Sequence, residues 1–336
     1  MIYPWQADNW NQLLARRGSL PHALLLHGRK GIGKLDFAYA FANALLCEQP
    51  RHDGSACGAC PACNWFSQGG HPDLWVIDPE REVDAGAEEG AETAKPEKKT
   101  SSQIKVEAIR ELADFINLSS HQSGLRIILI HPAEAMNVQA ANALLKTLEE
   151  PTPGTLFLLV THHLQHLLPT IRSRCQKIPL ASPSREQASA WLALQGVADG
   201  DVYLAQAGYA PLEAVKLADE EGQARRREFL GGIADPDKVD PIGMAESLKS
   251  ADLAEVVGWL QKWIYDLLSL RLGGRLRYQA DFEATLRTLA DKIALGPVLD
   301  FQRELTAVRQ TVSHPLNSQL VLEQLLFSYR NLIRSP

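Results

Sequence analysis

Residues 23–34 read ALLLHGRKGIGK, and this stretch decides the fold. Its first five residues form an apolar run, which predicts a buried strand, and the glycines that follow predict a tight loop. Residues 35–46 then carry apolar side chains at helical spacing, so a helix is expected directly after the loop. A strand, a loop with the spacing Gly-x4-Gly-Lys and a helix, in this order, predict a phosphate-binding loop within an α/β domain.

The candidate nucleotide ligands in this loop are three glycines and one lysine. Glycines let backbone N–H groups approach a phosphate, the helix N-terminus favours the anion, and the lysine reaches the terminal phosphates. A glycine-rich turn without any ligand is the alternative, because so short a motif also occurs by chance. The residues concerned are Gly28, Gly31, Gly33 and Lys34.

The magnesium site that usually accompanies such a loop is incomplete in this sequence. The position after Lys34, where a Ser or Thr hydroxyl would bind the metal, is Leu35. The strand expected at residues 125–130 should end in an acidic residue, but it is followed by His131, with Glu134 three residues further on. Because hydrolysis needs the metal to neutralise charge, we expect no ATPase activity. Weak, metal-independent nucleotide binding stays open, as does an ATPase that recruits Glu134.

The rest of the chain divides into two kinds of secondary structure. Apolar strands alternate with helices in the first half, which predicts a parallel sheet buried on both faces. After Pro183 only helical patterns follow, so an all-helical half is expected. The remaining strands are expected at residues 74–77, 125–130, 156–160 and 176–180, with helices around 109–116 and 137–150.

Four of the five cysteines fall in the short stretch 47–63, with the spacing C-x9-C-x2-C-x2-C. Four thiolates suit a closed, tetrahedral and therefore structural zinc site. An iron–sulfur cluster and free thiols are the alternatives, although the common bacterial iron–sulfur pattern has its fourth cysteine downstream. His71 could compete as a ligand, but it precedes Pro72 and we interpret it as a turn residue. The candidate zinc ligands are Cys47, Cys57, Cys60 and Cys63.

Charge and composition exclude several classes of protein. The formal net charge of −6 argues against a protein that coats nucleic acid, and also against a zinc-dependent DNA-binding module. Five cysteines in 336 residues exclude a disulfide-dense secreted scaffold. No apolar run approaches the roughly 20 residues that span a bilayer, so a cytoplasmic protein without membrane contact is expected.

Residues 78–103 are acidic and poor in apolar side chains, which predicts a disordered loop. The basic run 225–227 is expected on a solvated helix face or against a neighbouring subunit.

Two further motifs resemble those of a known family. Residues 142–151 read NALLKTLEEP, and Ser173-Arg174-Cys175 follows. Both resemble the AAA+ clamp-loader proteins of bacterial DNA polymerase III, over about residues 1–180. The cysteine insertion after the loop helix narrows the resemblance to the gamma/tau motor and one further subunit with a degraded magnesium site. Leu35 and His131 favour the latter.

This resemblance implies a fold with three domains. A RecA-like AAA+ core with a parallel sheet would cover residues 1–180 and carry the zinc-binding insertion at 47–63. An all-α lid would follow at 181–224, and an all-α collar at 225–336 would join the subunits into a hetero-pentameric ring.

The resemblance also implies a function. The chain would be a non-hydrolysing stator that helps to load the sliding clamp onto primed DNA, with gamma/tau motor subunits and a delta subunit as partners. Arg174 would be an arginine finger, supplied in trans to a neighbour's ATP. An ordinary surface arginine is the alternative for Arg174, and an active gamma/tau-like motor ATPase is the alternative for the chain.

Overall fold

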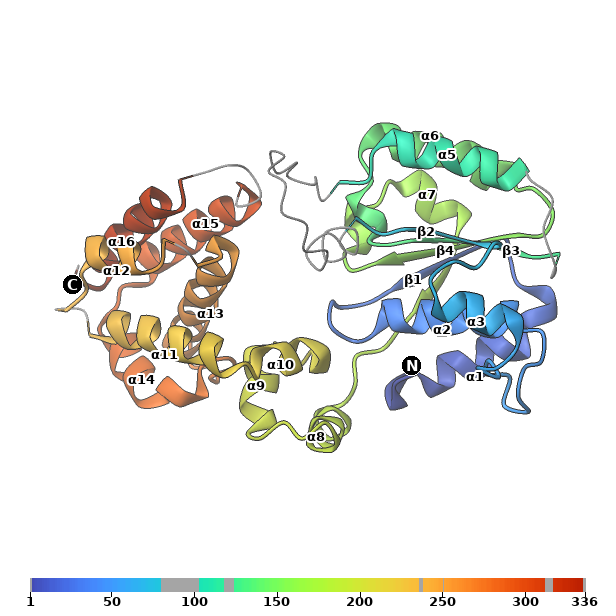
Figure 1. The fold of residues 1–336 in the computed structure, drawn as a ribbon. Helices are drawn as coiled ribbons and strands as arrows, with labels where there is room; N and C mark the ends of the chain where they lie inside the picture. The colour runs from blue at the N-terminus through green and yellow to red at the C-terminus, as the bar shows by residue number, and fades with distance from the viewer. Residues whose placement is uncertain are drawn as a thin grey trace, which may run out of the picture. The chain divides into compact units, whose positions relative to one another are not determined.

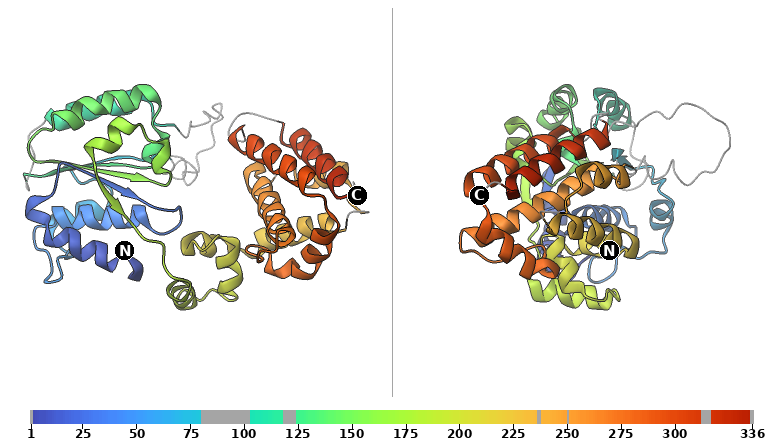
Figure 2. Two further views of the ribbon diagram at one scale, coloured as in Figure 1. Left: turned by 180° about the vertical axis from the view of Figure 1, so that it is seen from behind. Right: turned by 90° about the vertical axis from the view of Figure 1, so that its left-hand side faces the viewer.

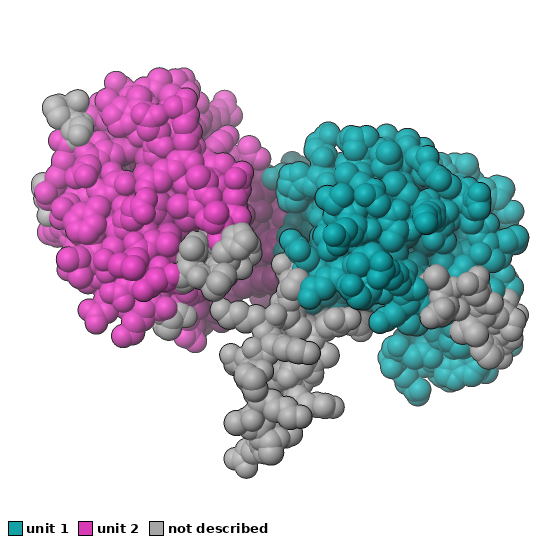
Figure 3. Space-filling view, turned by 90° about the horizontal axis from the view of Figure 1, so that it is seen from above, with its two compact units in different colours: residues 1–187 teal, residues 188–336 magenta. Residues whose placement is uncertain are grey.

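A computed structural model describes residues 2–79, 103–117, 124–235, 238–249, 251–311 and 317–334. The chain forms two compact units, Met1–Gln187 and Ala188–Pro336 (Figure 3). Most of the predicted disordered loop lies outside the described residues. The prediction is wrong at its first residue, because Asp78 directly follows a strand and is only 5% exposed. The domain boundaries at residues 180 and 224 stay predictions.

The first unit is built on five parallel strands in the order β2-β3-β4-β1-β5. In the register, Leu25 lies opposite both Leu159 and Lys177, so β1 is enclosed between β4 and β5. The carboxyl ends of all five strands therefore lie at one edge of the sheet. The strands are β1 (Ala23–His27), β2 (Leu74–Ile77), β3 (Arg126–Ile130), β4 (Thr155–Thr161) and β5 (Gln176–Pro179).

Helices cover both faces of this sheet (Figure 1). Leu24 packs in one apolar cluster with Phe37 and Phe41, whereas the next residue, Leu25, packs in the other with Leu112. Because successive side chains of a strand point to opposite faces, a strand buried on both faces must be apolar throughout. One face is covered by α1 (Ala7–Ala15), α2 (Lys34–Leu46) and α3 (Pro61–Ser67), the other by α5 (Val106–Asn117), α6 (Val138–Glu149) and α7 (Pro169–Arg174).

Local sequence signals explain where these helices begin and end. The Asn137 side chain accepts a hydrogen bond from the Ala140 N–H at 2.8 Å and so caps the N-terminus of α6. Pro151 lies just beyond the end of α6, where a proline cannot continue a helix. The parallel sheet, the clustered cysteines and the helical C-terminal half confirm the predicted fold class.

The second unit is all helical among its described residues (Figure 2). In its core, Trp263 Nε1 donates to the Tyr329 hydroxyl at 2.9 Å, and this hydroxyl donates to the Ile233 carbonyl at 3.0 Å. No helix in the described ranges is long and apolar enough to cross a membrane. The helices are α8 (Arg185–Leu194), α9 (Gly200–Gln206), α10 (Pro211–Leu217), α11 (Glu220–Ala234), α12 (Pro241–Ser247), α13 (Leu253–Arg271), α14 (Glu283–Lys292), α15 (Leu295–Thr311) and α16 (Ser318–Arg334).

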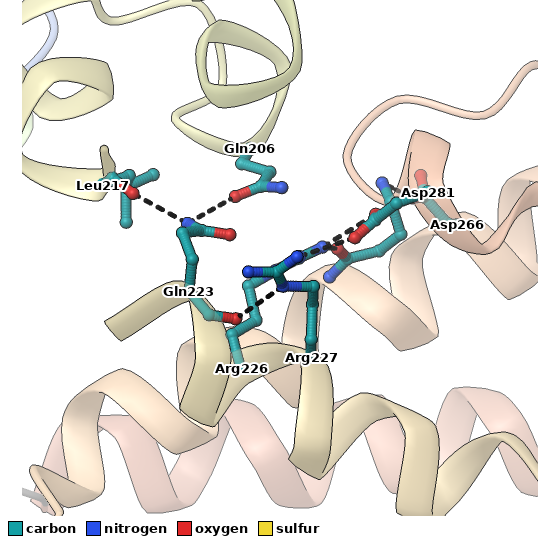
Figure 4. A network of polar contacts seen from close by, with 8 residues as sticks. Gln206, Leu217, Gln223, Arg226, Arg227, Asp266 and Asp281 are labelled. Atoms are coloured by element: carbon teal, nitrogen blue, oxygen red, sulfur yellow. Dashed lines mark hydrogen bonds and ion pairs between the residues drawn. The ribbon is translucent and has the colours of Figure 1, made fainter. Parts of the chain in front are cut away.

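A buried polar network holds α11 and α13 to the segment that precedes α14 (Figure 4). Arg226 is 2% exposed and contacts both carboxylate oxygens of Asp281, at 2.8 and 3.0 Å, as well as Gln279. Asp266 on α13 is fully buried and accepts three backbone N–H groups from residues 277–279. The expectation that residues 225–227 lie on a solvated face or against a neighbour is therefore wrong for Arg226.

We expect Arg226→Ala to lower the free energy of unfolding by about 3 kcal/mol, because it leaves Asp281 without its buried partner. Urea denaturation of the full chain measures this change. The matched control is Arg225→Ala, which removes only an exposed pair with Glu221 and should cost less than about 1 kcal/mol. Equal losses in the two variants would contradict a structural role for the Arg226 network.

Candidate nucleotide loop, cysteine cluster and Arg174

The predicted phosphate loop lies between β1 and α2 and brings its four candidate residues into one turn. Gly31 and Gly33 have φ angles of 76° and 82°, a left-handed conformation that favours glycine. A Cβ atom on Gly33 would also lie 2.1 Å from the ring of Tyr3, and one on Gly28 would lie 2.6 Å from the Leu180 carbonyl oxygen. Sterics alone therefore require glycine at positions 28 and 33. Their role as nucleotide ligands stays a prediction.

Lys34, the first residue of α2, is turned back onto its own loop. Its side chain is 2% exposed, and Nζ donates to the Arg29 carbonyl at 2.5 Å. Burial lowers the pKa of Lys34 to about 8, while the Glu134 carboxylate acts in the opposite direction. One of the three donors of the ammonium is therefore used within the loop itself.

The first residues of the chain cover the loop, which the sequence patterns did not reveal. Trp5 Nε1 donates to the Ile32 carbonyl at 3.0 Å, and Gln6 Nε2 donates to the Ile32 and Gly33 carbonyls, each at 2.9 Å. The Tyr3 hydroxyl lies 2.9 Å from an Asp36 carboxylate oxygen. The loop is thus held by side chains that come from a separate segment of the chain.

Histidines directly follow the ends of β3 and β4. His131 follows β3, is 4% exposed, and its Nδ1 lies 3.4 Å from the Asp78 carboxylate. Its Nε2 lies 3.3 Å from Nε2 of His162, which follows β4. Burial, together with the positive charge of Lys34, lowers the pKa of His162 to about 3, so this ring is neutral at pH 7. An imidazole pair therefore stands at the edge where a magnesium ATPase has an acidic residue.

Glu134 also lies at this edge, but one of its carboxylate oxygens already accepts hydrogen bonds. Its Oε1 accepts the backbone N–H groups of His162 at 2.8 Å and of His163 at 3.1 Å. Burial raises the pKa of Glu134, but a hydrogen bond to Thr161 and the backbone N–H groups outweigh this effect, and the net shift is downward. Oε2 is buried and has no hydrogen-bond partner in the part of the chain that the structure describes. The ionised carboxylate is therefore held in place mainly through Oε1.

The four cysteines predicted to bind zinc come together beyond the end of α2. Their sulfurs all lie within 4.8 Å of one another, with Cys47–Cys60 and Cys57–Cys63 both at 3.9 Å. Four sulfurs around one zinc at about 2.3 Å lie about 3.8 Å apart, so the cluster fits one tetrahedral ion. This is the single such group of metal-binding side chains within the described residues.

Backbone N–H groups favour the thiolate of Cys57, whereas burial raises the pKa of Cys47 and of Cys63. The N–H groups of Ala59 and Cys60 donate to the Cys57 sulfur at 3.4 and 3.3 Å and lower the pKa of Cys57 to about 6. Thiolates rather than thiols are the metal ligands. His71 lies outside the cluster: its Nδ1 accepts the Asp73 N–H at 3.1 Å, consistent with a turn residue.

Arg174 is the last residue of α7. Its Nη2 lies 2.5 Å from Oε1 of Glu149, the last residue of α6, and its Nη1 donates to the Thr170 carbonyl at 3.1 Å. About a third of the Arg174 side chain is exposed. Cys175 beside it is buried, which raises the pKa of its thiol to about 11, so this cysteine packs as a small apolar residue.

Known proteins resemble this chain over its whole length. The family described as "DNA polymerase III, delta subunit" matches residues 6–184, and the family of that subunit's C-terminal part matches residues 220–331. The Pseudomonas aeruginosa protein named DNA polymerase III subunit delta' is 35% identical, and the match covers 98% of both chains. The Escherichia coli K12 protein of that name is 28% identical over 96% of this chain and 94% of its own.

Two further similarities concern proteins with other names. The Escherichia coli K12 protein named DNA polymerase III subunit tau is 33% identical over 51% of this chain and 23% of its own length. A solved Thermotoga maritima structure, titled a DNA polymerase III gamma subunit-related protein, covers 98% of this chain at 18% identity with a TM-score of 0.46. The full-length matches decide the assignment: the chain belongs to the delta prime family of DNA polymerase III subunits.

Proposed function

We propose that this chain is the non-hydrolysing stator of a clamp loader, which helps to load the sliding clamp onto primed DNA during replication. The observation that carries the proposal is a loop that keeps its glycines and lysine but has Leu35 and His131 at two positions where magnesium needs oxygen ligands. Without this metal, charge on a transferring phosphoryl group is not neutralised. By itself the chain would thus be a component of the polymerase holoenzyme rather than an enzyme, with weak nucleotide binding at most.

The proposed partners follow from the relatives. Gamma/tau motor subunits and a delta subunit would complete a hetero-pentameric ring with this chain in the cytoplasm. The assembled complex, rather than this chain alone, would bind the clamp and primed DNA. The match to the tau protein over 51% of this chain supports a shared core, for which we propose residues 1–180. The helices beyond it would divide into a lid at 181–224 and a collar at 225–336 that joins the subunits.

Arg174 is the residue that we propose to act on a neighbour. A guanidinium at the C-terminal end of a short helix, one third exposed, can be presented to a phosphate on an adjoining subunit. There it would stabilise the charge that develops during phosphoryl transfer.

The cysteine cluster is proposed to hold a structural zinc ion. All four positions of a tetrahedral ion would be filled by the sulfurs of Cys47, Cys57, Cys60 and Cys63, so no position is left for a substrate. The ion would fasten α3 to the end of α2, because Cys47 follows α2 whereas Cys63 lies in α3.

An active motor ATPase is the second candidate function, and Glu134 is the observation that favours it. Its Oε2 is buried at the edge of the sheet and free of hydrogen bonds to the described residues, so it could bind a metal that Leu35 cannot. The other oxygen of Glu134 is already held by two backbone N–H groups, which limits its movement toward a metal.

The isolated chain should show no ATP turnover above background, with or without magnesium. A phosphate-release assay on the wild type and on Lys34→Ala decides between the two functions, since this substitution removes the amine that any turnover at the loop would use. Equal background rates support the stator. Turnover that disappears in Lys34→Ala would establish the motor instead.

In a reconstituted loader, Arg174→Ala should lower turnover at the ATP site that it serves by on the order of 10³, the usual effect of an arginine finger. The ATPase rate of the whole complex then falls by the fraction that this one site contributes to it. Arg172→Ala is the matched control, because Arg172 donates to Gln165 at 2.9 Å and should leave the rate nearly unchanged. An unaltered rate in Arg174→Ala would contradict the assignment.

The purified chain should contain about one zinc per molecule, measured by elemental analysis. Cys63→Ala should lose the metal and the ordered packing of α3, whereas Cys175→Ala should keep both, because Cys175 lies outside the cluster. Iron in place of zinc, or the same metal content in both variants, would refute a four-cysteine zinc site.

A further inference from the structure

We infer that Glu149 is a positioning residue for Arg174, and this inference rests on the proposed function of Arg174 as a finger. The Glu149 carboxylate lies 2.5 Å from Nη2, and the Thr170 carbonyl accepts from Nη1 at 3.1 Å. Two different segments of the chain, the end of α6 and the first turn of α7, thus hold one guanidinium.

The place of Glu149 in its helix supports a specific role. A carboxylate in the last turn of a helix lies against the negative end of the helix dipole, which disfavours it. A guanidinium at 2.5 Å offsets this cost for Glu149. Glu150 beside it is also exposed to solvent but forms no ion pair with the described residues. Of the two adjacent glutamates, Glu149 is therefore the one that contacts Arg174, and Glu150 serves as the matched control.

The geometry leaves Arg174 able to act while it is held. A guanidinium carries five N–H donors in a planar fork. Glu149 engages Nη2, whereas the Thr170 carbonyl at 3.1 Å and the Ser173 hydroxyl at 3.5 Å lie against Nη1. Nε and the second N–H of Nη2 make no hydrogen bond to the described residues and can meet a phosphate. A long arginine side chain loses considerable rotamer freedom when it is fixed on a target. Because Glu149 fixes it beforehand, less of that loss falls on the catalytic step.

The test uses the reconstituted loader with clamp and primed DNA, and compares Glu149→Ala, Glu149→Gln and Glu150→Ala. We expect Glu149→Ala to lower kcat at the site that Arg174 serves by roughly tenfold with little change in KM for ATP, as for an interaction made in the transition state. Glu149→Gln keeps an acceptor oxygen at the same distance and should retain an intermediate rate. Glu150→Ala should behave like the wild type.

The same substitutions in an Arg174→Ala background separate positioning from folding. Glu149→Ala should have no further effect there, because its role acts through Arg174. A further loss in that background would show a merely structural role and overturn the inference. A rate in Glu149→Ala that is unchanged or higher, beside a full loss in Arg174→Ala, would also overturn it and leave the proposed function intact. An unchanged rate in Arg174→Ala itself would contradict the proposed function instead.

Discussion

The burial of β1 between β4 and β5 is the constraint on which the rest of the first unit depends. Each residue of β1 is apolar up to His27, so the strand can be covered by helices on both faces. Its parallel pairing fixes where the glycine loop emerges, and the pairing of β4 with β3 then brings the ends of these strands to the same edge. The loop, His131 and His162 are therefore neighbours because of strand register rather than local sequence.

This constraint also explains which features could be predicted from the sequence. Strand, loop and helix around the glycines follow one another directly, and the cysteines lie within 17 residues, so spacing alone predicted this order and the clustering of the cysteines. The contact between His131 and His162 depends on the pairing of β3 with β4, and the periodicity of apolar residues in the sequence does not indicate it. The prediction for Arg226 is wrong for the same reason. Its partners lie more than 50 residues away, and a basic run that looks solvated in sequence has one buried member.

The loop shows how a motif can be held in place by contacts that involve no nucleotide. Gly33 is required by the Tyr3 ring and by its own backbone angle, whether or not a phosphate is ever bound. Lys34 makes a hydrogen bond within the loop, which gives the lysine a structural use. Such a motif keeps its signature for steric and hydrogen-bonding reasons, so its presence alone is weak support for catalysis. The residues that differ, Leu35 and His131, carry more information about function than those that match.

The contacts of the first residues with the loop have a practical consequence for spectroscopy. The indole of Trp5 donates to a loop carbonyl and its ring stacks on Tyr3 at a centroid distance of 5.0 Å. Any rearrangement of the backbone at Ile32 would change the polarity around this indole, and with it the wavelength of its emission. The difference in emission between the wild type and Trp5→Phe would isolate this indole from the other six tryptophans and so report on the candidate nucleotide loop without an attached label.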